Sequence, residues 1–250
     1  MKPFNLIVYS PSGHGKTYLA GSGVGDPRIS PMLLLDFEAG VDSIESRVCP
    51  ISLADLPKVD KPPLDKVTVV RINTWSDFQH VHSFLSGPNN PYRMVVLDSL
   101  SEMNYLNMSE ALRTAILLDK GHDPDIAEQR DYLRSYSQMR RLVRVYRDLN
   151  IHVMFTCAAQ TVQDTVTKEY VTKPTMAGKL TDEIPHLVKV VGYLAVVDPL
   201  DGTPPYRTLL TQPTGRFTAK DRTEGGKLSP RIDNPTLPKI FDLLTGVVAE

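Results

Sequence analysis

Residues 5–17 read NLIVYSPSGHGKT, an apolar run followed at once by a glycine-containing loop and a helix start. The last eight residues match the phosphate-binding pattern G-x-x-x-x-G-K-[ST], except that Ser10 stands where the pattern has glycine. After a strand, the N–H groups of such a loop form a concave anion site. Serine is the smallest polar substitute for the first glycine. Because the loop follows a strand and keeps Gly13 and Gly15, we predict a phosphate site; the alternative is a glycine-rich turn with an exposed lysine.

The same loop predicts which side chains would contact a nucleotide. Lys16 would reach the β and γ phosphates, the Thr17 hydroxyl would bind Mg²⁺, and His14 fills a variable position of the pattern. The predicted nucleotide-binding residues are Ser12, Gly13, His14, Gly15, Lys16, Thr17 and Tyr18.

Two acidic residues at the ends of other apolar runs could complete this site. The run RMVVLDSL (93–100) has Asp98 at its carboxyl end, where ligands bind in parallel sheets, so we assign Mg²⁺ to Thr17 and Asp98. The run MLLLDFEAG (32–40) places Glu38 near the same edge, where it would orient the water that attacks a γ-phosphate. The alternative is that Glu38 is only a loop acid near a helix start.

The rest of the chain alternates apolar runs with helical patterns, which predicts an α/β fold with a mostly parallel central sheet flanked by helices. We expect a single domain over residues 1–250, with a β-rich edge at its C-terminal end. The predicted strands are residues 5–9, 32–36, 67–72, 93–98, 151–156, 188–197, 207–211 and 216–219. One predicted helix begins at Lys16. The other predicted helices are 75–85 (with Asn73 and Thr74 as possible caps), 102–118, 124–150 and 237–244.

The order of these motifs resembles the RecA/Rad recombinase and hexameric-helicase superfamily. That family has its catalytic glutamate after the strand that follows the phosphate loop, where DFE (36–38) lies here, and serine after its Mg²⁺ aspartate, as after Asp98. The resemblance implies that Gln160, at the end of HVMFTCAAQ (152–160), senses the γ-phosphate, although two alanines precede it where the family often has asparagine. The stretch 178–198 is similar to the family's turn, helix and strand.

TAKDRTEGG (218–226) looks like the K-x-R segment of the replicative helicases. There the lysine and arginine reach a neighbouring subunit's γ-phosphate, which would make Lys220 and Arg222 a catalytic pair acting in trans; the alternative is a basic surface turn. The resemblance covers residues 5–245 and is greatest to phage-encoded AAA-type nucleotide-binding proteins, a group that includes core-only single-strand annealing proteins. Typical members carry glycine where Ser10 stands.

By the same resemblance, the segment after Gln160 is the second of two loops that contact single-stranded DNA. The first would lie within 118–129, with Lys120 and His122. Cations and a stacking aromatic are the minimum that a single-strand site requires, and residues 161–179 supply Lys168, Tyr170, Lys173 and Lys179. A ligand-free hairpin that pairs 164–166 with 170–172 fits the segment equally well.

Composition and charge limit the partners and the compartment. A net charge of −1 gives no overall positive field, so nucleic acid could bind only to a local basic patch. Arg140, Arg144 and Arg147 fall on one face of the predicted long helix, either as a solvated face or as a contact stripe. Cysteine usage favours a reducing, cytoplasmic setting, the host cytoplasm for a phage-encoded protein, and no apolar run has the roughly 18–20 residues of a membrane span, so no membrane partner is expected.

Together these patterns predict a Mg²⁺-dependent ATPase that hydrolyses ATP slowly and assembles on single-stranded DNA for annealing or recombination. It would self-associate into a ring or filament with ATP sites at subunit interfaces, and a single-strand-binding protein is a further expected partner. The alternative is a nucleotide-switched assembly or loader protein that acts on a protein partner without binding DNA. A small-molecule P-loop kinase is disfavoured, because Glu38 and the Lys220/Arg222 pair serve water attack and subunit coupling.

Overall fold

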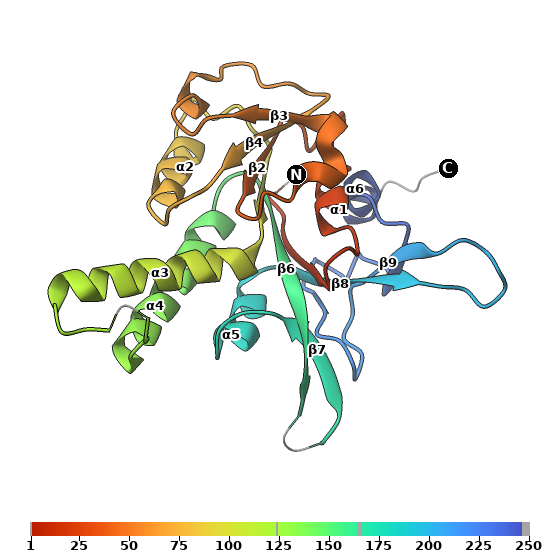
Figure 1. Cartoon of the computed structure of the whole chain (residues 1–250). Helices are drawn as coiled ribbons and strands as arrows, with labels where there is room; N and C mark the ends of the chain where they lie inside the picture. The colour runs from red at the N-terminus through yellow and green to blue at the C-terminus, as the bar shows by residue number, and fades with distance from the viewer. Residues whose placement is uncertain (1, 124, 165–166, 247–250) are drawn as a thin grey trace.

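The computed structural model describes residues 2–123, 125–164 and 167–246, and its strands join in one sheet (Figure 1). Neighbouring strands follow the order β11-β9-β8-β1-β6-β5-β2-β4-β3, with β10 paired to β8 and β7 to β6. The parallel strands are β1 (Asn5–Ser10), β2 (Met32–Asp36), β3 (Val48–Ile51), β4 (Val67–Arg71), β5 (Met94–Asp98), β6 (His152–Gln163) and β8 (Val190–Val197). The antiparallel strands are β7 (Tyr170–Pro174), β9 (Tyr206–Leu210), β10 (Lys220–Asp221) and β11 (Arg231–Asp233). The mostly parallel α/β fold with an antiparallel C-terminal edge is therefore confirmed.

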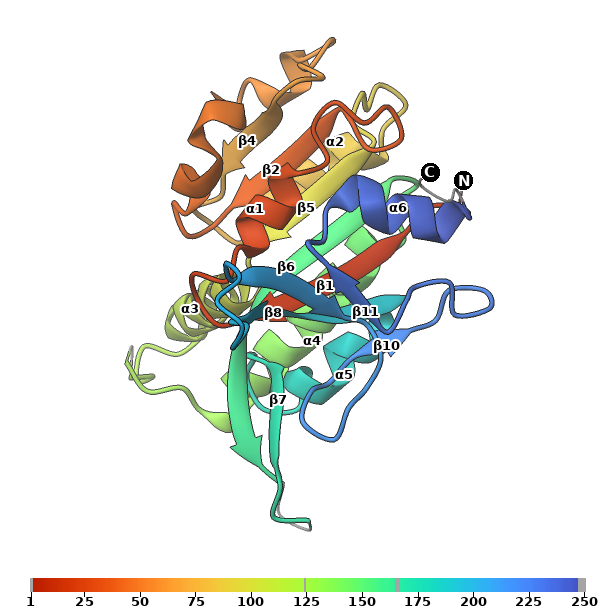
Figure 2. The same cartoon turned by 90° about the vertical axis from the view of Figure 1, so that its right-hand side faces the viewer.

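Helices cover both faces of this sheet, as Figure 2 shows. One face carries α1 (Lys16–Gly21) and α6 (Leu237–Thr245); the other carries α2 (Asp77–Ser86), α3 (Leu100–Leu118), α4 (Gln129–Arg147) and α5 (Leu180–Leu187). The side chains of β1 alternate between these two layers, because successive residues of a strand point to opposite faces. Leu6 and Val8 pack with α1 and α6, whereas Ile7 and Tyr9 pack in the other core cluster. An unbroken apolar run suits a strand that is buried on both faces.

The strand order brings the carboxyl ends of β1, β5 and β2 to one edge of the sheet. β6 lies between β1 and β5, so Ser10 pairs with Ala158, and Leu97 pairs with Phe155 one residue before Asp98. Asp98 in turn pairs with Asp36 of β2. The phosphate loop and the two predicted acidic segments consequently meet although they are far apart in the sequence.

Two predicted helices have wrong boundaries. The long helix α4 begins at Gln129 and ends at Arg147, not at 124 and 150; Pro124 lies outside the described residues. α2 begins at Asp77, and the expected caps Asn73 and Thr74 instead donate their backbone N–H groups to the Asp77 carboxylate, at 3.0 and 2.9 Å. A helix end depends on such local polar contacts, which the apolar period does not record.

Several strands also differ from the prediction. The expected strand 216–219 is absent from the described structure: Phe217 forms only isolated bridges, and β10 begins at Lys220. β3, β7 and β11 had not been assigned as strands, apart from the hairpin alternative. β6 continues to Gln163 and pairs with β7 as a hairpin that extends away from the body of the fold (Figure 1). In it Gln163 faces Tyr170, so the pairing partner of 170–172 is 161–163 rather than the predicted 164–166.

Two 3₁₀ segments, η1 (Val41–Arg47) and η2 (Leu56–Lys58), lie in the crossovers around β3. None of the helices in the described part of the chain combines the length and apolar character that a membrane crossing requires.

Candidate functional site

The loop between β1 and α1 has the backbone of a phosphate loop. Gly13 and Gly15 have φ of 78° and 93°, in the left-handed region that favours glycine. Ser10, in contrast, is the buried last residue of β1, and it is not among the described non-glycine residues with positive φ. The Lys16 ammonium donates to the carbonyl oxygens of Ser10 at 3.1 Å and Pro11 at 3.2 Å, so it lies folded over this loop. Glycine at position 10 is not required by the backbone of this chain.

Asp98 meets the loop from the end of β5. Its carboxylate accepts a hydrogen bond from the Thr17 hydroxyl at 2.7 Å on Oδ2 and another from the Thr156 hydroxyl on Oδ1. The residue is only 6% exposed, and this burial raises the pKa of its carboxyl. Thr156 was missed by the sequence interpretation, although a lone hydroxyl in the apolar run of β6, level with Asp98, was a signal for it.

These groups fit a bound Mg²⁺. The Thr17 hydroxyl and the Asp98 carboxylate are hard oxygen donors, and Mg²⁺ is usually held by one or two carboxylates, with phosphates and water completing its shell. The described residues contain no cluster of three or more His, Cys, Asp or Glu side chains that could hold a metal alone. Burial lowers the pKa of Lys16, and the nearby carboxylates of Asp98 and Glu38 oppose that shift.

Glu38 is held at the same edge by its neighbours. The Ser99 hydroxyl donates to Glu38 Oε1, and the backbone N–H of Glu38 donates to Asp36 Oδ1 at 3.1 Å. Asp36 itself is buried and ion-paired with Arg71 at 3.0 Å, so its carboxylate shapes the turn that carries Glu38. The side chain of Glu38 is exposed, as a group that orients a water molecule must be.

The predicted sensor and trans-acting residues do not join this group of side chains. Gln160 lies further along β6, and its amide donates to the Thr181 hydroxyl at 3.3 Å. Lys220 pairs in register with Val191, which is level with Ile7 in the middle of β1. Its ammonium donates to the Pro185 carbonyl, and burial, with Arg222 nearby, lowers its pKa to about 8.

Arg222 is exposed just after β10, and its backbone N–H donates to the carbonyl oxygen of Lys189 at 2.9 Å, just before β8 begins. The pair therefore lies away from the phosphate loop of its own chain.

The β6–β7 hairpin borders a groove of about 720 Å³ whose other wall is the segment 214–217. Tyr170 is 65% exposed there, and Arg216 and Phe217 line the opposite side. Backbone hydrogen bonds from Thr172 N to Arg216 O (2.7 Å) and from Thr218 N to Thr172 O (3.1 Å) join the two walls. Arg216 was missed by the sequence interpretation because its place beside the hairpin depends on these long-range contacts.

The predicted DNA-contacting residues differ in their surroundings. Lys168 is exposed at the hairpin turn, and Lys179 is exposed at the start of α5. Lys173 is ion-paired with Asp182 at 2.7 Å. His122 of the predicted first loop is buried against Asp131 at 2.8 Å, so the expectation that it faces DNA is wrong.

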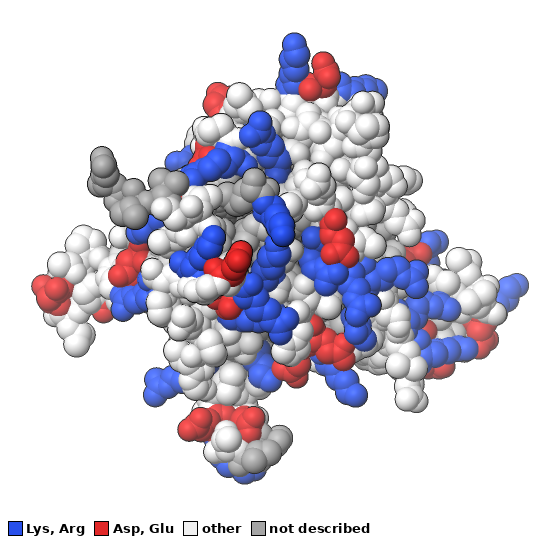
Figure 3. Space-filling model, turned by 180° about the vertical axis from the view of Figure 1, so that it is seen from behind, with Lys and Arg blue, Asp and Glu red and all other residues white. Residues whose placement is uncertain are grey.

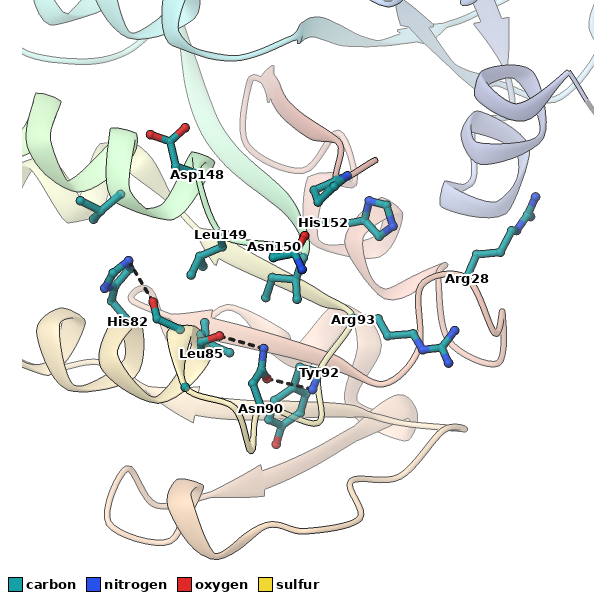
Figure 4. Close-up of a pocket in the computed structure, with 15 residues that line it drawn as sticks. Arg28, His82, Leu85, Asn90, Tyr92, Arg93, Asp148, Leu149, Asn150 and His152 are labelled. Carbon is teal, nitrogen blue, oxygen red and sulfur yellow. Dashed lines mark hydrogen bonds between the residues drawn. The ribbon is translucent and has the colours of Figure 1, made fainter. Parts of the chain in front are cut away.

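The opposite edge of the sheet carries a different hollow, of about 1050 Å³, shown in Figure 4. Its cationic side chains already have partners: Arg28 is ion-paired with Asp26 at 2.6 Å and Asp242 at 2.7 Å, and Arg93 donates to the Pro27 carbonyl. Asn90, also labelled in Figure 4, holds its own turn through hydrogen bonds at 3.0 and 2.9 Å. This cavity lies away from the phosphate loop and takes no part in the site described above.

Basic side chains gather across the middle of the face shown in Figure 3, with acidic side chains among them. On α4, Arg140 is ion-paired with Glu183 at 3.1 Å, and Arg147 with Asp148 at 2.7 Å. Two of the three arginines predicted on one face therefore already have acidic partners, which favours the solvated-face interpretation over a contact stripe.

Fold and site together define a RecA-like P-loop ATPase core. The phosphate loop joins β1 to α1, and the buried Asp98 at the end of β5 reaches Thr17 of α1 although β6 lies between β1 and β5. A family profile described as an AAA domain matches residues 2–223, and the chain belongs to this family. Among solved structures, a KaiC-like protein from the hyperthermophilic archaeon Pyrococcus horikoshii OT3 is similar at 11% identity and a TM-score of 0.46, covering 84% of this chain and 79% of the other. No curated protein sequence matches the chain.

Proposed function

We propose that this chain binds ATP with Mg²⁺, hydrolyses it slowly, and assembles on single-stranded DNA to promote annealing or recombination. The observation that carries the nucleotide part is the hydrogen-bonded contact of Thr17 with Asp98 at 2.7 Å, beside Lys16 and Glu38. A surface loop that bound no ligand would have no need of a buried carboxylate aimed at its threonine.

The chain's own groups would divide the work as follows. Lys16 would leave the loop carbonyls that it now contacts and bind the β and γ phosphates. Thr17 and Asp98 would hold Mg²⁺, which when bound offsets negative charge on the phosphate oxygens. Glu38, fixed through one carboxylate oxygen by Ser99, would orient the attacking water with the other.

The test of this part is steady-state ATP hydrolysis and equilibrium ATP binding. Lys16→Ala should abolish both. Glu38→Gln should keep binding and lose hydrolysis at least about 100-fold, the usual range for a general base. Glu45→Gln, which changes an exposed acid in the neighbouring η1 segment, is the matched control and should leave both unchanged. Undiminished hydrolysis by the Glu38 variant would remove that residue from the mechanism.

The DNA part is supported by the groove between the hairpin and residues 214–217. Its exposed Tyr170 offers a stacking surface, with Lys168 at the hairpin turn and Arg216 across the groove as cations for phosphates. Tyr170→Ala should weaken binding of a fluorescent oligo-dT by about 1–3 kcal/mol, the range measured for stacking on one base. Tyr105→Ala on α3, with a similar exposure of 62%, is the control.

Binding should also weaken as salt rises, because phosphate contacts release counterions. An absence of binding at low salt would reject the DNA role and leave the nucleotide role standing.

Assembly with ATP sites at subunit interfaces is the third part of the proposal. Lys220 and Arg222 lie away from their own phosphate loop, which agrees with action on a neighbouring copy. Arg222→Ala should lose ATPase activity, and mixing it with Glu38→Ala protein should restore some, since a mixed interface can combine an intact Glu38 with an intact Arg222. Equal inactivity of the mixture would argue against the trans role.

A loader or assembly factor is the second candidate, favoured by one observation. Tyr132 and Leu133 of α4 are 53% and 61% exposed beside a mainly apolar cavity of about 430 Å³ next to α5. Exposed apolar surface of this kind suits a protein partner. ATPase activity that responds to no DNA, with Tyr170→Ala without effect, would favour this function over the first.

A further inference from the structure

The strand β9 reaches the phosphate loop from the far side of β8. β8 continues beyond the end of β1, and Arg207 pairs in register with Val196 at that end. From there its Nε donates to the backbone carbonyl of His14 at 2.8 Å. The ring of His14 lies 3.3 Å from the carbonyl oxygen of Leu194 in β8. The variable position of the phosphate loop is thus the point where the β8–β9 pair contacts it.

The guanidinium of Arg207 lies directly beside the loop backbone. A Cβ atom built on Gly15 would stand 2.5 Å from Nε and 3.1 Å from Cζ of Arg207, which is closer than a real Cβ contact. Any side chain at this position would displace the arginine, in addition to the strain of a φ of 93°. Gly15 therefore leaves room for the Arg207 guanidinium against the backbone of the loop.

Tyr18 holds this cation in place. Tyr18 is 40% exposed, and the guanidinium carbons of Arg207 and Arg47 each lie 5.5 Å from the centroid of its ring. Guanidinium groups are attracted to an aromatic ring at this range. Arg47 comes from the end of η1 and Arg207 from β9, so two distant segments bring positive charge to the loop through one tyrosine.

We propose that Arg207 is a nucleotide-binding residue of this chain, which supplies the phosphates with a second cation in cis beside Lys16. This rests on the proposed nucleotide site. Arginine has five N–H donors in a planar fork, so it can keep its Nε bond to His14 and still pair with phosphate oxygens through the terminal nitrogens. In contrast to Lys220 and Arg222, it needs no second copy of the chain.

The test is the order of ATP affinities among substitutions at one position, measured by displacement of a fluorescent ATP analogue with Mg²⁺ present. Arg207→Ala should weaken ATP binding about tenfold. Arg207→Lys keeps the charge and should recover part of the loss. Arg207→Gln can still donate a hydrogen bond to the His14 carbonyl but carries no charge, so it should bind as weakly as the alanine variant. Arg231→Ala is the matched control, because Arg231 also lies over a tyrosine, Tyr206 at 5.7 Å, but is ion-paired with Asp233 at 2.7 Å.

Each outcome decides the proposal. If the glutamine variant binds ATP as well as wild type while the lysine variant does not, Arg207 only supports the loop through His14 and the proposal is overturned. It is overturned as well if Arg207→Ala binds ATP like wild type. Lys16→Ala separates this from the proposed function: unchanged binding there would reject the nucleotide site itself. The melting temperatures of the Arg207 variants and of wild type, measured without nucleotide, should agree within a few degrees, which would exclude a folding defect.

Discussion

Replacing Thr156 by valine measures how strongly the fold supports the charge on Asp98. Thr156 is fully buried, and its hydroxyl donates to one carboxylate oxygen while Thr17 donates to the other. Valine has nearly the same shape, so the change removes a donor without leaving a large cavity. A hydrogen bond to a charged group contributes about 1.5–3 kcal/mol. We therefore expect the free energy of unfolding to fall by about 2 kcal/mol at a pH where Asp98 is ionised.

The direction of the pH dependence follows from burial. Because burial raises the pKa of Asp98 above its unfolded value, its ionisation lowers stability as the pH rises through the folded pKa. Thr156 stabilises the ionised form, so the valine variant should lose more stability over that rise than wild type does. The difference in the free energy of unfolding between wild type and Thr156→Val should be small in acid and reach its full size at higher pH.

Urea unfolding followed by circular dichroism at several pH values gives this difference, provided that the m-value is unchanged. A double-mutant cycle with Asp98→Asn isolates the pair, because the neutral amide carries no charge for Thr156 to stabilise. In the Asp98→Asn protein, Thr156→Val should lower the free energy of unfolding by less than about 1 kcal/mol. An equal cost in both backgrounds, or a loss that does not change with pH, would refute the reasoning.

Three further predictions test single features of the fold. Ser10→Gly should change ATP affinity less than about tenfold (1.4 kcal/mol), because Ser10 belongs to β1 and no left-handed backbone requires glycine; a larger change in an ATP titration would contradict this. His152, whose pKa burial lowers to about 4, stays neutral and accepts a hydrogen bond from Phe4 N at 3.1 Å. The free energy of unfolding of the wild type should therefore fall by up to about 3 kcal/mol as the pH falls from about 6.5 to 4. In urea titrations, His152→Asn should not show this decrease. Tyr146→Phe removes a buried hydroxyl that donates to the Phe78 carbonyl at 2.9 Å, and should lower stability by about 1 kcal/mol; unchanged unfolding would show that this bond contributes nothing.

Much of the fold was predictable because its signals are local. The run NLIVYS forms β1, MLLLD forms β2, and the glycines of SPSGHGKT take the left-handed conformations that the phosphate-loop pattern requires. The mostly parallel α/β architecture followed from strands alternating with helices, whereas the RecA-like class was implied by the resemblance of the motif order to that family. The roles of Glu38, Gln160, Lys220 and Arg222 remain predictions.

Two further errors arose from contacts that residue spacing along the chain does not reveal. Residues 216–219 have the composition of a strand, yet backbone bonds to Thr172 hold them in an irregular segment beside β7. His122 looks like a polar loop residue, but Asp131 gives its ring a partner and allows it to be buried. Neither partner could be identified from spacing along the chain.

The sequence by itself determined the phosphate loop, the two acidic strand ends and the class of fold, because hydrophobic period, glycine placement and polar strand ends act over a few residues. Tertiary structure alone decided which side chains surround the loop. The insertion of β6 between β1 and β5 brings Thr156 to Asp98, and the pairing of β9 with β8 brings Arg207 to His14. Strand order is set by packing over the whole sheet, so the local sequence can mark Thr156 as a hydroxyl in an apolar run but cannot identify Asp98 as its partner, nor His14 as the partner of Arg207.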